Sequence, residues 1–436
     1  MAATMNNMKI FTNARVIDPA SDFDGNTQVL VNEGVIAGIG DELSEEYNCE
    51  IIDCDGHVLM PGLIDMRVST GEPGEEHRET LRSAGYAAVS GGITTIIVQP
   101  DTNPCIDNAS KVDFIKRRGR DYCLAKVLPC GALTKGLAGE QMAEIGLMAQ
   151  AGAIMFANGY GAIKDTKVMQ RLLAYSCTFD ALIAARPQDP WLAKGGVVAQ
   201  GELAARLGLG GISSSAETIF ANRDISLAAA TGAKLLLDMI SSKNTIPLIE
   251  TAKGHGLDVF ASVNIHNLCL NDNDIGDYRT FAKLDPPLRS ENDRLALIKA
   301  IKDGIIDVIV SGHDPRPPEE KRLPFDEAAF GSSALEALLP AALTLYHSGN
   351  LELLEVIRPM TANPAALLGL SQGKIQIGAP ADLILVDLGY PHRFDASQTY
   401  SKSKNAAFDG RLFQGKVLQT FVNGAKVYDI ETGVVK

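Results

Sequence analysis

Residues 60–104 read MPGLIDMRVSTGEPGEEHRETLRSAGYAAVSGGITTIIVQPDTNP and contain one complete β-α-β unit. An apolar run over 62–65 predicts a buried strand, a helical pattern covers 76–90, and a second apolar run follows over 94–99. Apolar runs of this kind are typical of parallel strands that are covered on both faces. The segment therefore predicts a parallel sheet with helices packed outside it.

The same alternation continues along the middle of the chain. Counting outward from the first unit gives eight predicted strands, at residues 62–65, 94–99, 125–129, 153–156, 178–185, 234–240, 258–263 and 307–311. Helical patterns between them include 164–175, 216–230 and 294–303. Eight such units over roughly 250 residues predict an α/β fold, a (β/α)8 TIM barrel. A doubly wound open sheet is the alternative, but it would normally carry a G-x-G-x-x-G loop after its first strand, and none occurs there.

The two chain ends have a different pattern, in which short β-rich runs are separated by turns. These runs lie at residues 9–17, 27–39, 50–60, 381–386, 416–422 and 425–428. Neither end has enough strands to enclose a core alone, and chain ends often lie close together. We therefore expect one β-sandwich domain formed by residues 1–60 plus 375–436, flanking a barrel domain of residues 61–374.

Composition excludes several classes of protein. The chain has 436 residues, with 53 acidic and 40 basic side chains and a formal net charge of −13, which argues against a nucleic-acid partner. Its seven cysteines are scattered without a C-x-x-C pair, as in reduced cytoplasmic proteins. Residues 1–11 lack a signal-peptide core and no apolar run of about 18 residues follows, so we expect a cytoplasmic protein with no membrane contact.

Catalytic groups of a barrel lie at the C-terminal ends of its strands. The side chains predicted there form a candidate residual pocket of Arg67, Asp101, Asn103, Arg186, Asn264, His313, Asp314 and Arg316. A zinc site needs three or four histidine, cysteine or carboxylate ligands, usually with two close in sequence. The chain has seven histidines and no His-x-His or His-x-x-x-His pair, and only His266 and His313 fall at predicted strand ends. We interpret both as hydrogen-bonded structural histidines and predict no metal ligand, no cofactor and no catalytic residue.

Three segments carry a resemblance to a known family. Residues 60–104 resemble the start of a dihydroorotase barrel, and residues 285–321, DPPLRSENDRLALIKAIKDGIIDVIVSGHDPRPPEEK, resemble its end. TANPAALLGL at 361–370 and GKIQIGAPADLILVD at 373–387 resemble the return into the sandwich. The resemblance covers nearly the whole chain and points to the dihydroorotase and allantoinase branch of the amidohydrolases. It implies the amidohydrolase type of barrel, with the sandwich deduced above.

The chain departs from that family where active members bind metal. The resemblance matches their His-x-His pair with Arg67 and Ser69, their metal-bridging aspartate with Asn158, the histidines after strands five and six with Arg186 and Met239, and the catalytic aspartate of strand eight with Gly312. It also matches the substrate-binding arginine with Gly71 and its asparagine partner with Asp101. Opening or closing the dihydroorotate ring needs a metal-activated water and a carboxylate that moves the proton. These departures imply a pseudoenzyme.

Three functions follow from this resemblance. The first is a structural and regulatory role in pyrimidine biosynthesis, in which the chain assembles with aspartate transcarbamoylase catalytic chains, as non-catalytic dihydroorotase homologues do. We also expect the chain to form a homo- or hetero-oligomer. In the second, Arg67, Arg186 and Arg316 replace the dication and bind an anion, although pairing with Asp65, Asp101, Asp189 or Asp314 is the favoured interpretation. The third is an active zinc-dependent cyclic amidohydrolase that converts dihydroorotate and water to N-carbamoyl-aspartate, against which the unpaired histidines weigh.

Overall fold

Eight parallel strands form a closed barrel in the computed structural model, which describes residues 8–47 and 49–435. The strands are β8 (Leu63–Val68), β9 (Ile93–Val98), β10 (Lys126–Ala132), β11 (Met155–Ala157), β12 (Ile183–Ala185), β15 (Leu235–Ile240), β16 (Val259–Asn264) and β17 (Val308–Val310), and they are hydrogen-bonded in this order. The ring closes through a parallel bridge between Val68 and His313, where Ser69 N donates to His313 O at 2.9 Å. The predicted (β/α)8 barrel is confirmed.

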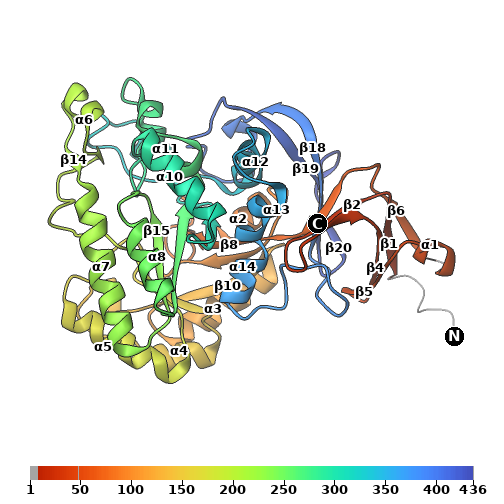
Figure 1. Cartoon of the computed structure of the whole chain (residues 1–436), viewed down its shortest axis with the longest axis horizontal. Coiled ribbons are helices and arrows are strands. Elements are labelled where there is room, and N and C mark those ends of the chain that lie inside the picture. Colours follow the sequence, from red (N-terminus) through yellow and green to blue (C-terminus); the bar gives the residue numbers. More distant parts are fainter. Residues whose placement is uncertain (1–7, 48, 436) are drawn as a thin grey trace.

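Helices cover the outside of the barrel (Figure 1). The longer ones are α2 (Leu81–Ser90), α3 (Ala109–Tyr122), α5 (Thr166–Ser176), α7 (Ser214–Thr231), α8 (Ile246–Gly254), α10 (Glu291–Lys302) and α12 (Leu338–His347). The shorter ones include α4 (Ile145–Ala151), α6 (Glu202–Leu207), α9 (Ile265–Cys269), α11 (Pro318–Lys321), α13 (Leu353–Ile357) and α14 (Ala362–Leu367). Across the described ranges, we find no helix with both the length and the apolar character that a membrane crossing requires.

Two predicted elements begin later than expected. The helix predicted over 76–90 begins at Leu81, because the Thr80 side chain accepts a hydrogen bond from Ser83 N at 3.0 Å and caps the helix there. The strand predicted over 178–185 begins at Ile183, because Cys177–Phe179 form a 3-10 turn at the end of α5. A side-chain cap sets the first boundary and a 3-10 turn sets the second.

Strands from both chain ends pair in a β-sandwich, which lies beside the barrel in Figure 1. One sheet contains β5 (Val35–Gly40), β4 (Gln28–Asn32), β1 (Lys9–Thr12) and β6 (Glu50–Asp53). The other contains β21 (Gly433–Val434), β20 (Ala425–Asp429), β19 (Leu412–Val422), β18 (Leu383–Arg393), β7 (Val58–Pro61), β2 (Arg15–Asp18) and β3 (Phe23–Asn26).

One hydrophobic core joins these two sheets. Phe11 of β1 meets Phe421 of β19 edge to face, with ring centroids 5.0 Å apart. The predicted sandwich is thus present, whereas its domain boundaries at residues 60 and 375 stay a prediction. Residues 1–7, which carry most of the segment that lacks a signal-peptide core, lie outside the described residues.

Residues 187–213 form an excursion from the barrel that the sequence pattern did not indicate. After β12 the chain forms a small parallel sheet of β13 (Val198–Ala199) and β14 (Gly211–Ile212), with α6 between them. Tyr278 Oη donates to Leu207 O at 2.7 Å and ties the excursion to the loop after β16. The excursion therefore adds surface to the C-terminal side of the barrel, since it leaves directly from the end of a strand.

Candidate functional site: the barrel mouth

The guanidinium of Arg67 occupies the C-terminal mouth of the barrel. Arg67 lies at the end of β8 and is 1% exposed. Its Nη1 donates to Oε1 of Gln99, the residue after β9, at 2.5 Å and lies 3.3 Å from Oδ2 of Asp238 in β15. The guanidinium carbon also lies 4.5 Å from the ring centroid of Tyr160, which follows β11. One side chain thus connects the ends of four strands.

The charges around Arg67 keep it protonated. Burial lowers the pKa of Arg67, but the charges of Asp238, Tyr160 and Asp101 together outweigh this effect, so the pKa lies above its ordinary value. Asp101, the residue that the resemblance matches with an asparagine, accepts a hydrogen bond from Ser69 Oγ at 3.1 Å. Burial raises the pKa of Asp101, and the charge of Arg67 acts in the opposite direction. The mouth therefore holds a permanent cation beside carboxylates.

Arg186 anchors the opposite side of the mouth. It follows β12 and is 4% exposed, and its Nη2 donates to Asp285 Oδ1 at 2.6 Å and to Gln188 Oε1 at 2.9 Å. Its Nη1 donates to the carbonyl of Met239 at 2.9 Å. Met239 has a φ of 55° within a register shift of β15, an uncommon backbone for a residue with a side chain. Met239, which the resemblance matches with a histidine, thus contributes a backbone carbonyl that accepts a hydrogen bond from Arg186.

Arg316 pairs with Asp314 in the loop after β17. Arg316 Nη2 donates to Asp314 Oδ2 at 2.7 Å, and Arg78 Nη2 reaches the other carboxylate oxygen at 3.2 Å. Of the predicted arginine partners, Asp314 is therefore correct for Arg316. Arg67 instead forms an ion pair with Asp238, and Arg186 forms one with Asp285. Neither carboxylate was among the predicted partners.

The prediction that Asp65 or Asp189 pairs with these arginines is wrong, because both carboxylates bind other groups. Buried Asp65 accepts hydrogen bonds from the Ser311 hydroxyl, from Ser311 N at 3.2 Å and from Arg67 N at 3.1 Å, which joins β8 to the end of β17. Asp189 accepts from the backbone N–H groups of Trp191 and Leu192 at 2.8 and 3.0 Å. Each carboxylate satisfies backbone donors and shapes a chain segment rather than neutralising a guanidinium.

Two glycines at the mouth are closed off by their neighbours. Gly312, matched with the catalytic aspartate, has a φ of 60°, and a Cβ there would lie 2.1 Å from Asn264 Nδ2. Gly71, matched with the substrate-binding arginine, would place a Cβ 1.8 Å from the Glu75 carbonyl oxygen. Real Cβ atoms do not approach other atoms so closely, so the surrounding structure is built for glycine at both positions.

Asn158 uses its whole side chain to hold nearby backbone. Its Oδ1 accepts from Thr134 Oγ1 at 2.7 Å, and its Nδ2 donates to the carbonyls of Leu137 and Gly161 at 3.1 and 3.2 Å. An aspartate has no N–H group for those carbonyls, so the amide is required by this packing. The position matched with a bridging aspartate therefore has a local structural role.

The two histidines at the strand ends are buried and packed. His313 Nδ1 accepts from Ala334 N at 3.1 Å, and its Nε2 lies 3.6 Å from Glu79 Oε2. His266 Nδ1 lies 2.7 Å from Asn264 Oδ1, and its ring stacks on Phe408 with centroids 4.9 Å apart. Burial lowers the pKa of His266 to about 3, so this ring is neutral at physiological pH.

The structure separates the predicted pocket residues into groups. Asn103 is exposed, and its carbonyl packs against Gly74. The residues that sequence reasoning missed are Gln99, Asp238, Tyr160 and Asp285. A signal existed for the first two, because each is a polar residue within or directly after an apolar strand. The other two lie in loops, where sequence spacing does not fix position.

These side chains do not fit a zinc ion. Among the residues that the structure describes, no three histidine, cysteine or carboxylate groups converge as metal ligands would. The buried guanidiniums of Arg67 and Arg186 lie at the strand ends where the family would place ligands, and their charge would repel a dication. We therefore derive no chemical step through a metal.

Comparison with known proteins places the chain in a family. Residues 56–245 match the Dihydro-orotase-like family and residues 194–427 match the Amidohydrolase family. A dihydroorotase from Wolbachia sp. subsp. Drosophila simulans (strain wRi) is 37% identical over 96% of this chain and 95% of that protein. A dihydroorotase from Anaplasma phagocytophilum (strain HZ) is 36% identical, with coverage of 97% and 95%.

Solved structures agree with this placement. The L-hydantoinase (dihydropyrimidinase) from Arthrobacter aurescens superposes with a TM-score of 0.89 at 25% identity, covering 98% of this chain and 97% of that one. The dihydropyrimidinase from Brevibacillus agri NCHU1002 shares the fold, with a TM-score of 0.84 at 20% identity and coverage of 96% and 95%. From its full-length similarity to curated relatives and its barrel, this chain belongs to the dihydroorotase family of the amidohydrolases.

Proposed function

We propose that this dihydroorotase-family chain has lost metal-dependent hydrolase chemistry and acts in pyrimidine biosynthesis as a structural partner of aspartate transcarbamoylase catalytic chains. The observation that carries the proposal is the buried Arg67 guanidinium, bound by Gln99 and Asp238 at the barrel mouth. The closed positions Gly71 and Gly312 support it, because neither admits the side chain that catalysis would need.

Two of the carboxylates at the mouth, Asp238 and Asp314, are poorly placed to carry a proton. A general base must reach the reacting water and hold an accessible lone pair. Asp238 and Asp314 are 4% and 2% exposed, and both lie beside guanidiniums of arginine. A substrate would have to displace Arg67 to reach Asp238, or Arg316 to reach Asp314, at the cost of unpaired buried charge.

A role as a binding partner needs an intact fold but no open active site. This chain has such an arrangement, because side chains fill the barrel mouth while the barrel itself is complete. The barrel keeps its eight strands, its closure between Val68 and His313 and its capped helices, so its outer surface stays ordered. The test mixes this protein with purified aspartate transcarbamoylase catalytic chains from the same organism and follows assembly by sedimentation velocity. We expect a co-sedimenting complex, and separate boundaries at micromolar concentrations would overturn the proposal.

An active dihydroorotase is the second candidate, favoured by the names of the curated relatives. The discriminating measurements are the zinc content of the protein purified without chelator and its hydrolysis of dihydroorotate. We expect substoichiometric zinc and activity no higher than in a buffer control. One or two zinc ions per chain together with turnover would establish the second candidate.

Anion binding by the arginines is a third candidate, favoured by one observation. Within the described residues, Arg67 Nε and Nη2, Arg186 Nε and Arg316 Nε are buried without a hydrogen-bond partner. Because each arginine already faces a carboxylate, little net positive charge is left for a ligand. A thermal-shift screen with phosphate, N-carbamoyl-aspartate and orotate tests this candidate, since a bound anion raises the melting temperature.

A further inference from the structure

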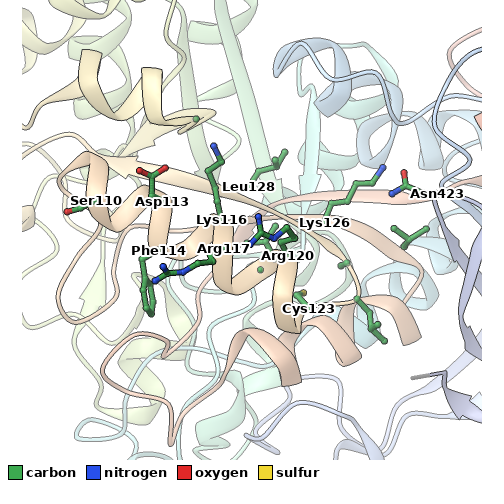
Figure 2. A pocket seen from close by; sticks show the side chains of 16 residues that line it. Ser110, Asp113, Phe114, Lys116, Arg117, Arg120, Cys123, Lys126, Leu128 and Asn423 are labelled. Atoms are coloured by element: carbon green, nitrogen blue, oxygen red, sulfur yellow. The ribbon is translucent and has the colours of Figure 1, made fainter. Parts of the chain in front are cut away.

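A groove of about 940 Å³ lies at the end of the barrel where β10 begins, opposite the arginine network. Figure 2 shows the residues that line it. It is bordered by α3 from Ser110 to Arg120 and by the first residues of β10, together with Gly152 after α4 and the turn at Val422 and Asn423. Because β10 runs from Lys126 in the groove to Ala132 near the mouth, the two sites are separated by the length of a strand.

The floor of the groove is apolar and incompletely covered. Phe114, Leu124, Val127 and Leu128 line it and are half-buried, whereas all six residues of the neighbouring strand β9 are buried. Helix α3 packs tightly on strand β10, since a Cβ at Gly119 would lie 2.4 Å from Val127 Cβ. The open floor therefore lies beside the contact between α3 and β10 and leaves apolar side chains for another molecule to cover.

The rim of the groove is basic, although the protein as a whole is strongly acidic. Lys116, Arg117, Arg120 and Lys126 line it with a single carboxylate, Asp113, whereas the chain carries a net charge of −13. Figure 2 shows the first three cations along α3 and Lys126 near Asn423. Such a local reversal of sign attracts an acidic partner and orients it.

The fold uses only part of this positive charge. Lys126 Nζ binds buried Asp382 at 2.6 Å, and Lys116 Nζ donates to the Ala151 carbonyl at 2.6 Å. Arg120 meets only its neighbour Asp121, and its side chain is 75% exposed. Arg117 makes no hydrogen bond or ion pair within the described ranges 8–47 and 49–435. Of the four rim cations, Arg117 and Arg120 are therefore the two that the described residues engage least.

The chemistry of the groove favours an acidic polypeptide over a small phosphate or a nucleic acid. The groove runs along α3 from Ser110 to Arg120, and the carbonyl groups at the C-terminal end of this helix repel anions. A net charge of −13 disfavours a polyanion that extends beyond the groove. A segment with spaced carboxylates and one apolar side chain would bind both the basic rim and the apolar floor.

We propose that this groove receives an acidic segment of the aspartate transcarbamoylase catalytic chain, with an apolar side chain on the floor and carboxylates at Arg117 and Arg120. This inference rests on the proposed function and gives that function a contact surface. The groove lies outside the barrel mouth, so partner binding and the closed mouth are independent features of one scaffold.

The test compares the affinity of two charge-reversed variants for purified aspartate transcarbamoylase catalytic chains. The double variant R117E/R120E reverses the charge of these two positions at the groove rim. The control variant K167E/R171E makes the same change in net charge at exposed positions of α5. We expect the rim variant to weaken binding about tenfold or more and the α5 variant to bind nearly as wild type does. The neutral variant R117Q with R120Q should weaken binding by a smaller factor, and thermal melts confirm that all variants fold.

The possible outcomes separate the two proposals. If the wild-type protein forms no complex, the proposed function and the groove proposal both fail. If wild type binds and the rim variant binds equally well, the groove proposal fails while the proposed function stands. Self-association of wild type that the rim variant abolishes would identify a second copy as the occupant. Displacement of the partner by inorganic phosphate, but not by chloride at equal ionic strength, would identify a small-anion site. Either result would overturn the groove proposal.

Discussion

The side-chain amide of Asn264 lies where any side chain at position 312 would begin. A Cβ added to Gly312 would be 2.1 Å from Asn264 Nδ2, and the φ of Gly312 is 60°. Asn264 itself is held by hydrogen bonds from the backbone N and Nδ1 of His266. An acidic side chain at position 312 therefore requires Asn264 to move from its hydrogen-bonded position.

Replacing Gly312 with aspartate should destabilise the protein by about 3 kcal/mol, because steric overlap adds to backbone strain. Gly304 is a matched control, since its φ is 71° and nothing lies within 4 Å of a Cβ there. G304D should cost about 1 kcal/mol, from backbone strain alone. Urea denaturation measures the free energy of unfolding of both variants. Equal losses of stability would show that Asn264 moves aside without cost. Adding N264A to G312D should restore part of the stability.

Arg67→Met should destabilise the fold by about 3–5 kcal/mol, because it leaves buried Asp238 without its cation. Arg120→Met is the control at an exposed position and should change the free energy of unfolding by less than about 0.5 kcal/mol. The variant R67M with D238N should recover much of the loss, since it removes the unpaired charge. Guanidinium denaturation curves provide the comparison. A cost for R67M below that of R120M would contradict the central role of this guanidinium.

Restoring a His-x-His pair by R67H with S69H should not restore hydrolase activity. The pair would supply two imidazoles, but Gly312 and Gly71 still exclude the acidic and basic side chains that the reaction needs. The measurement is dihydroorotate hydrolysis with added zinc, alongside zinc stoichiometry. Turnover above that of the wild-type protein would mean that the mouth is more adaptable than its packing indicates.

The pair of Glu79 and His313 should make folding stability sensitive to acid. Burial raises the pKa of Glu79, but the nearby imidazole of His313 and the hydroxyl groups of Ser401 and Ser83 together outweigh it, so the pKa lies below its ordinary value of 4.5. A depressed carboxyl pKa adds stability above about pH 4.5 that is lost as the pH falls toward the native value.

Glu79→Gln should therefore flatten the acidic limb of the stability curve. The measurement is the free energy of unfolding of wild type and E79Q between pH 6 and about 3. E319Q, at an exposed position in α11, should keep the wild-type slope. Parallel curves for wild type and E79Q would remove this pair from the acid response.

Sequence periodicity was sufficient for the barrel and the sandwich, because both depend on repeated apolar runs. It did not reveal the residues that face Arg67 and Arg186. Asp238 follows an apolar run in β15, and Asp285 lies in a loop far along the chain, so only tertiary structure brings each to its arginine. Nor did it reveal the groove beside α3, because the exposure of Val127 depends on how the helix crosses its strand.

The Arg67 guanidinium is a cation that is synthesised with the polypeptide. It is present once in every chain from the moment of translation, it does not dissociate on dilution, and no competing ion exchanges with it. Its charge also persists across the physiological pH range. Assembly of the barrel mouth therefore depends on folding alone, and a cell that is starved of transition metals would still produce this part of the scaffold in full.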